Sequence, residues 1–265
     1  MNAAAPATPY VVLGDDLSPG SDLAWLWVNS QHWPGWTLVD LQAEPPAFGR
    51  QVPPEDAAPH PVVGDPPRDV IAESGFAEVR FEVATSDPRL ALSGWPDATL
   101  VVVGGASSGV GPRSVGSTTE WLLHDPTNPV VLARRGRSVR TAIVCADGSA
   151  HASDAATTLA GLPWSGEVAV SALAVDDGRT DTDAAIDAVT QVLDGHVASV
   201  SGSVHRGRKP HREILAEART SDPDLIVLGT HGLTTIRRLT LGSTANAVAQ
   251  LAGCSVLVSR SRLGE

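Results

Sequence analysis

Short apolar runs alternate with segments of helical spacing along the whole chain. An unbroken run such as residues 98–103 is typical of a strand buried on both faces of a parallel sheet. Such runs predict strands at residues 10–13, 36–41, 79–83, 98–103 and 129–132, and again at 141–146, 164–175, 200–206, 225–228 and 254–258. Strands that alternate with helices predict an α/β fold with a parallel, doubly wound sheet.

Helices are expected where apolar residues recur at a spacing of three to four. This pattern predicts helices at residues 22–28, 120–124, 211–219 and 245–252, with one more at 68–74. Residues 42–68 are rich in proline and acidic side chains and show little periodicity. We therefore expect a loop there.

The chain repeats itself. The first strand of each copy ends in a similar tripeptide, D-L-S at residues 16–18 and D-G-S at residues 147–149. The tripeptide G-S-T occurs at residues 116–118 and again at 242–244. The repeat predicts two tandem domains, residues 1–136 and 137–265, joined by the short polar linker RRGRSVR.

A strand, a glycine turn and a helix start follow one another between residues 224 and 260. Gly229, Gly232, Gly242 and Ser243 give the spacing G-x2-G-x9-G-[ST]. Glycines let the backbone approach an anion, and the exposed N–H groups of a helix start donate to it. The pattern predicts a phosphate site, and its alternative is a plain strand-to-helix turn with a cap.

This spacing resembles the nucleotide-binding pattern of the universal stress protein family. The resemblance extends over nearly the whole chain, as in a tandem two-domain member of actinobacterial type. It implies two domains, each a five-stranded parallel sheet in the order 3-2-1-4-5 flanked by helices. Family members commonly pair through the last strand, which implies an antiparallel contact between residues 129–132 and 255–258. The two domains would then form an internal pseudo-dimer, and a homodimer of whole chains stays open.

The resemblance also implies an adenine nucleotide in the second copy, with ATP as the expected cofactor and Mg²⁺ as its optional companion. AMP and cyclic nucleotides stay open. Asp147 is expected at the adenine and ribose end, with a helix N-cap as its alternative role. The expected contacts are Asp147, Gly148, Ser149, Ala174, Gly229, Thr230, His231, Gly232, Gly242, Ser243 and Thr244. Of these, Ala174 is expected to present a small apolar backbone contact to the adenine.

Other polar residues near this motif have weaker claims to a role. His231 has no acidic partner nearby in the sequence, so we do not expect catalysis from it. Arg237 and Arg238 are expected on a solvated face. A basic cluster after the third strand of the second copy either edges the site or faces water, and it comprises Arg206, Arg208, Lys209 and Arg212.

The first copy departs from the pattern. Gly104 and Gly116 are twelve residues apart, one fewer than the matching pair in the second copy, and Ser107 replaces the middle glycine. Leu17 replaces the glycine of D-G-S and is expected to crowd the adenine side. We therefore expect weak or no ATP binding in the first copy.

Composition narrows the function classes. The formal net charge is −11, and residues 1–136 carry 7 basic against 16 acidic side chains. An acidic surface disfavours nucleic-acid and anionic-membrane partners. No apolar stretch is long enough for a membrane span and no signal-peptide pattern opens the chain, so a cytoplasmic protein is expected. No metal-binding pattern is recognised, and the uneven distribution of tryptophans is explained by packing.

The two cysteines are expected to be reduced and unpaired. Cys145 falls on the first strand of the second copy and Cys254 at the start of its fifth. In the order 3-2-1-4-5 the fourth strand separates them, which places their Cα atoms near 10 Å apart, beyond the roughly 7 Å limit of a disulfide.

Three functions remain open. The first is an ATP-binding stress-response protein that acts through nucleotide-dependent conformation or association. It would not be an enzyme beyond slow ATP hydrolysis, because no G-K-[ST] lysine is present. The second is an interaction module whose glycine loops are structural. The third is an enzyme of the nucleotide alpha-hydrolase type.

Overall fold

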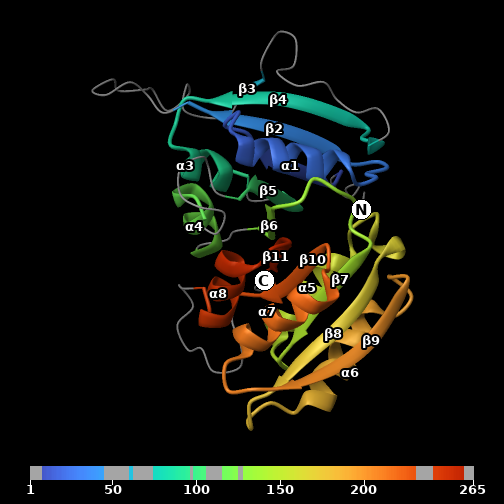
Figure 1. Cartoon of the computed structure of the whole chain (residues 1–265). Coiled ribbons are helices and arrows are strands. Elements are labelled where there is room, and N and C mark those ends of the chain that lie inside the picture. The colour runs from blue at the N-terminus through green and yellow to red at the C-terminus, as the bar shows by residue number, and fades with distance from the viewer. Residues whose placement is uncertain are drawn as a thin grey trace, which may run out of the picture.

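A single mixed sheet organises the molecule (Figure 1). The computed structural model describes residues 8–44, 60–61, 74–95, 98–105, 115–124, 128–230 and 241–259. Its 11 strands lie in the order β3-β4-β2-β1-β5-β6-β11-β10-β7-β8-β9. The strands of the first half are β1 (Tyr10–Gly14), β2 (Thr37–Ala43), β3 (His60–Pro61), β4 (Glu78–Ala84), β5 (Leu100–Gly104) and β6 (Val130–Ala133). Those of the second half are β7 (Thr141–Ala146), β8 (Ala169–Asp176), β9 (Ser199–Arg206), β10 (Leu225–Gly229) and β11 (Ser255–Ser259).

The order 3-2-1-4-5 appears twice, as β4-β2-β1-β5-β6 and as β9-β8-β7-β10-β11, with all neighbours in each set parallel. This confirms the predicted fold class. The antiparallel contact between the last strands is confirmed as well, because Val130, Val131 and Leu132 of β6 pair with β11. The short strand β3 was not predicted. It lies in the expected loop and pairs antiparallel with β4, so it adds a sixth strand to the first half.

Helices cover both faces of the sheet (Figure 1). One face packs against α1 (Pro19–Asn29), α5 (Ala150–Ala160) and α6 (Thr182–Leu193). The other packs against α3 (Pro88–Ser93), α4 (Ser117–His124), α7 (Pro210–Ser221) and α8 (Ser243–Leu251). Because both apolar clusters contain residues of the two halves, the core runs through the junction instead of stopping at it.

Side-chain caps fix where several helices begin. Ser18 caps α1, Asp87 caps α3, Ser149 caps α5 and Asp181 caps α6, each by accepting a hydrogen bond from a backbone N–H of the first turn. The apolar pattern alone did not assign α3, α5 or α6. The helix expected at residues 68–74 lies outside the described residues apart from its last position. The predicted strand at 164–175 begins later, because a 3₁₀ turn, η2 (Ser165–Glu167), precedes β8.

Tryptophans join the two halves. Trp27 and Trp33 of the first half lie edge-on to Trp164 of the second, with ring centroids 5.9 and 6.1 Å apart. All three rings are at most 4% exposed. Burial of such large side chains contributes strongly to stability, so the halves share one core.

Arginines of the linker bind the second half. Arg135 donates from Nη2 to Asp222 at 2.6 Å and from Nε to the carbonyl of Gly253 at 3.1 Å. Arg134 donates to the carbonyl of Ala249 at the end of α8, and burial lowers the pKa of its guanidinium to about 10. The linker is therefore short and polar, as predicted, but it is also packed against the domain that follows it.

Asp224, which directly precedes β10, also contacts the linker between the two halves. Its carboxylate accepts hydrogen bonds from the backbone N–H groups of Arg140 and Thr141 at 2.9 and 3.0 Å, and it pairs with Arg137 Nε at 2.6 Å. Burial alone would raise the pKa of Asp224. The two N–H donors, the Arg137 charge and the Thr141 hydroxyl outweigh burial and lower the pKa below its ordinary value of 3.8.

We expect Asp224→Ala to lower the free energy of unfolding by about 2 kcal/mol at neutral pH, because buried donors lose their acceptor. A carboxylate with a lowered pKa stabilises the fold above its unfolded pKa and loses that effect as pH falls through its folded pKa. The difference between the two proteins should therefore shrink below pH 3.8. Urea unfolding at neutral and acidic pH measures this. Asp222→Asn, which removes the exposed ion pairs with Arg135 and Arg137 and keeps a side chain that tolerates the left-handed backbone at φ +46°, is the matched control and should cost less than about 0.5 kcal/mol.

Both cysteines are free, and β10 lies between β7, which carries Cys145, and β11, which Cys254 precedes. The prediction of two unpaired thiols is confirmed. Burial raises the pKa of Cys254 to about 11, and it raises that of Cys145 as well. Both thiols therefore stay protonated near neutral pH. Among the described residues, no helix has the length and apolar character needed to cross a membrane.

Candidate functional site

The second half has a cavity of about 280 Å³ at the carboxyl ends of its parallel strands. The ends of β7, β8 and β10 form its floor, and the starts of α5, α7 and α8 form its walls. Open α/β sheets bind ligands at this edge, where strand order reverses. The cavity is therefore where the fold would place a ligand.

The turn after β7 contributes a carboxylate. Asp147 accepts from the backbone N–H and the hydroxyl of Ser149 through one oxygen, Oδ1, at 3.0 and 2.6 Å. Ser149 caps α5 by accepting from the N–H of Ala152. The cap role considered for Asp147 thus falls to Ser149, and both residues line the cavity. Gly148 does not line it. It makes the turn, with a φ of +77° that favours glycine.

Gly229 lies at the end of β10 and lines the cavity. A Cβ at this position would stand 2.6 Å from the carbonyl carbon and oxygen of His151 in α5. Glycine is thus required because the first turn of α5 crosses the end of β10. This is a packing reason, which adds to the phosphate approach inferred from the motif.

Backbone hydrogen bonds hold Thr230 and Gly242, the residues at the two ends of the segment that connects β10 to α8. Thr230 donates its N–H to Ser259 and accepts from the N–H of Gly242, at 3.0 and 2.7 Å. The predicted contacts His231 and Gly232 lie outside the described residues, as do Arg237 and Arg238.

The start of α8 faces the cavity through Gly242, Ser243, Thr244 and Ala245. Its N-cap is Gly242, and no side chain caps this helix. The N–H groups of its first turn therefore keep their capacity to donate, and the helix dipole places partial positive charge there. Two hydroxyl groups stand beside them. Such an arrangement accepts phosphate.

An apolar wall lies across the cavity. Leu173 and Val175 of β8 and Ile214 of α7 form it. The side chain of Ala174 is fully buried in the core on the other face of the sheet, so only its backbone can make the predicted contact, which stays a prediction. Because side chains alternate along a strand, Leu173 and Val175 supply the apolar side chains of the cavity on either side of it.

The loop after β8 adds residues that the sequence did not single out. Asp177, Arg179 and Thr180 line the cavity. Hydrogen bonds from the backbone N–H groups of Arg179 and Thr180, the Thr180 hydroxyl and the Arg179 charge lower the pKa of Asp177 against a small effect of burial. The sequence could have indicated these three residues, because every loop that follows a parallel strand lies at this edge of the sheet.

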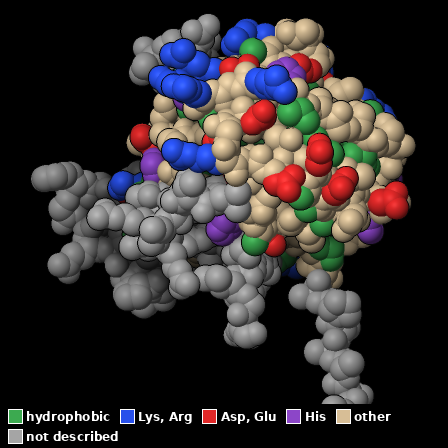
Figure 2. Space-filling model, turned by 90° about the horizontal axis from the view of Figure 1, so that it is seen from below, with side chains coloured by type: hydrophobic (Ala, Val, Ile, Leu, Met, Phe, Trp, Pro, Cys, Tyr) green, Lys and Arg blue, Asp and Glu red, His purple; other side chains and the backbone are tan. Residues whose placement is uncertain are grey.

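The basic cluster lies at the rim. Pro210 lines the cavity, and Arg208 and Lys209 precede it as exposed side chains. Arg206 lies 3.6 Å from Asp176. Figure 2 shows the face of the molecule that lies at the bottom of Figure 1, with acidic side chains spread over it and basic ones gathered toward one side. The basic cluster therefore lies at the edge of the cavity and is also exposed to water.

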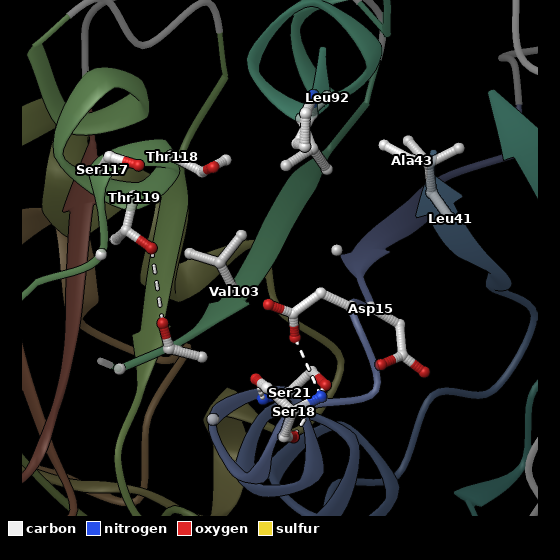
Figure 3. A pocket seen from close by; sticks show the side chains of 17 residues that line it. Asp15, Ser18, Ser21, Leu41, Ala43, Leu92, Val103, Ser117, Thr118 and Thr119 are labelled. Atoms are coloured by element: carbon white, nitrogen blue, oxygen red, sulfur yellow. Dashed lines mark hydrogen bonds between the residues drawn. The ribbon is translucent and has the colours of Figure 1, made fainter. Parts of the chain in front are cut away.

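The first half has an equivalent cavity of about 220 Å³ (Figure 3). The serine and threonines at the start of α4 lie on one side of it, Leu41 and Ala43 on another, and Asp15 with the serines of α1 at its base. Leu17 is 57% exposed and is not among the lining residues, so the expectation that it crowds this site is wrong. It adopts a φ of +56°, which keeps the turn that Gly148 makes in the second half.

The second cavity fits an adenine nucleotide. The uncapped start of α8 and the hydroxyls of Ser243 and Thr244 suit phosphates, and the apolar wall suits a flat base. Asp147 Oδ2 accepts no hydrogen bond from any described residue, so it can accept from a ribose hydroxyl. A magnesium ion here would be held mainly by the phosphates, since no group of three His, Cys, Asp or Glu side chains gathers among the described residues.

These features define a doubly wound α/β protein with ligand cavities at the carboxyl edge of its sheet. Residues 162–260 match the model of the universal stress protein family. Universal stress protein YxiE of Bacillus subtilis is 34% identical over 58 residues, which are 22% of this chain and 39% of that protein. Residues 162–260 of the second half therefore resemble the universal stress protein family.

Solved structures agree on the fold of the whole chain. A universal stress protein from Archaeoglobus fulgidus has a TM-score of 0.67 at 18% identity, over 96% of this chain and 99% of that one. A putative universal stress protein from Pseudomonas aeruginosa has a TM-score of 0.59 at 15% identity, over 96% and 94%. At these identities the likeness concerns the fold alone.

Proposed function

We propose that this chain binds one adenine nucleotide, ATP, in the cavity of its second half and acts in the stress response through nucleotide-dependent conformation or association. One observation carries the proposal. A single cavity combines the uncapped start of α8, the hydroxyls of Ser243 and Thr244, and an apolar wall. A phosphate and a base need these two environments at opposite ends of one site.

The expected consequence of binding is structural and not catalytic. Lys209 is the one lysine of the sequence, and it is the N-cap of α7, next to Pro210 at the rim of the cavity. No other lysine can take the place of the lysine that reaches the phosphates in P-loop enzymes. Hydrolysis, if measured, should be slow. The partner is then the nucleotide itself, inside an internal pseudo-dimer made by β6 and β11.

The nucleotide that leaves the purified full-length protein on denaturation tests the proposal, together with calorimetric titration of nucleotide-free protein. We expect ATP to bind at one equivalent per chain, more tightly than AMP or a cyclic nucleotide. The full chain is the right material, because the tryptophan contacts between the halves would be lost on separation. Absence of any nucleotide binding would favour the interaction module. Rapid turnover would favour the alpha-hydrolase type.

A further inference from the structure

The two cavities occupy matching places but differ in charge. Asp15 lines the first cavity where Ala146 lines the second, since each directly precedes the aspartate of the D-L-S or D-G-S tripeptide in its half. Asp15 is only 3% exposed. A charge that is shielded from water acts more strongly on a ligand beside it.

The helix that faces each cavity differs in the same direction. α4 carries Glu120 in its first turn, whereas α8 has no acidic residue there and has Asn246 at the matching position. An acidic side chain at this place offsets the partial positive charge of the helix start. The start of α4 therefore attracts an anion less than the start of α8 does.

The two cavities also differ in the basic side chains that line them. Arg179 lines the second cavity, and no basic side chain is among the described residues that line the first. Two carboxylates line each cavity, Asp15 and Asp16 in the first and Asp147 and Asp177 in the second, but only the second has an arginine to offset them. The absence of a basic side chain from the described lining, together with Glu120 of α4, makes the first cavity less favourable for a polyphosphate than the second.

The uncharged part of the first cavity still suits a ring with hydroxyl groups. Leu41, Leu92 and Val103 form an apolar wall, and carboxylates and hydroxyls stand across from it (Figure 3). Carboxylates accept hydrogen bonds from sugar hydroxyls, and the wall accepts a flat apolar face.

We propose that the cavity of the first half binds an uncharged nucleoside and rejects its phosphates. One chain would then hold a nucleotide in one half and a nucleoside in the other. The choice of a nucleoside, in place of another hydroxylated ring, rests on the proposed function of the matching cavity. The charge selectivity does not rest on it.

Titration of the full chain with adenosine, in the presence of saturating ATP, tests the proposal. We expect one equivalent of adenosine to bind and ATP not to displace it. No adenosine binding under these conditions, or two equivalents of ATP in the unaltered protein, would overturn it. If ATP does not bind at all, the proposed function fails, while one bound equivalent of adenosine still supports the present inference.

A charge exchange makes the test specific. Asp15→Asn with Glu120→Gln removes the two negative charges and keeps side-chain size nearly constant, and we expect ATP affinity for the first cavity to rise at least tenfold, to a second equivalent per chain. Asp15→Asn alone, which keeps an acceptor for the N–H of Leu17, covers the case in which the pair does not fold. Glu78→Gln removes an exposed charge on β4 away from the cavity and should leave one equivalent. A variant that folds but gains no ATP binding would contradict the proposal.

Discussion

Replacing Gly229 with alanine should destabilise the second half severely. The added Cβ would stand 2.6 Å from backbone atoms of His151, where real contacts are never found, and backbone cannot move aside as a side chain can. Overpacking against rigid neighbours costs about 3 kcal/mol. For a chain of this size we therefore expect the melting temperature to fall by roughly 6–12 °C.

Substitutions at two further glycines serve as comparisons for this result. Gly253→Ala, just before β11 at the opposite edge of the sheet, has no atom within 4 Å of its new Cβ, so its melting temperature should stay within about 1 °C of the parent. Gly104→Ala repeats the Gly229 geometry in the first half, where the Cβ would meet the carbonyl of Gly20 at 2.1 Å. Thermal unfolding of all three variants is the measurement. Equal stability of Gly229→Ala and Gly253→Ala would show that α5 does not cross the end of β10 so closely.

The apolar pattern was sufficient for the sheet. Runs such as residues 98–103 have few alternatives to a strand buried on both faces, and ten of the eleven strands follow from them. β3 did not, because two residues beside a proline carry no periodicity. Helices α3, α5 and α6 were not predicted, although each begins at a side-chain cap. α3 has only six residues, whereas α5 and α6 bury apolar residues at helical spacing, so their sequences did carry the signal.

The site could be predicted where one segment forms it. The stretch from Gly229 to Thr244 is contiguous, and its described residues line the cavity together. The rest depends on contacts between distant segments. The wall formed by Val175 and Ile214, and the position of Arg179, follow from the packing of α7 beside β8. The sequence placed only a backbone contact at Ala174, whose side chain faces the core, and did not single out the neighbouring side chains that line the cavity.

In the first half, the sequence motif was a poor guide to the shape of the site. The loop there departs from the motif, and the departures predicted weak or no ATP binding with Leu17 crowding the site. A cavity is present because the sheet and the helices set the backbone that surrounds it. Leu17 takes the turn at positive φ and stays outside the cavity. The motif therefore did not predict the shape of this site.

Replacing Ser243 with glutamate should abolish ATP binding and leave the protein folded. Ser243 is exposed at the start of α8, and an acidic side chain in a first turn stabilises a helix by about 0.3–1 kcal/mol. The same charge meets the phosphates. At a separation of about 6 Å and an effective dielectric constant of about 20, repulsion between two unit charges is roughly 3 kcal/mol. We therefore expect ATP affinity to fall by about two orders of magnitude.

The ATP-induced rise in melting temperature measures this loss, because that rise reports ligand bound to the native state. Ser117→Glu adds the same charge at the matching position of α4 and should keep the full rise. Ser243→Gln, of the same length but uncharged, should keep most of it. If Ser243→Glu retains the ATP-induced rise, the phosphates do not meet the start of α8. If instead Ser117→Glu loses it, the nucleotide binds in the first half and the roles of the two cavities are reversed.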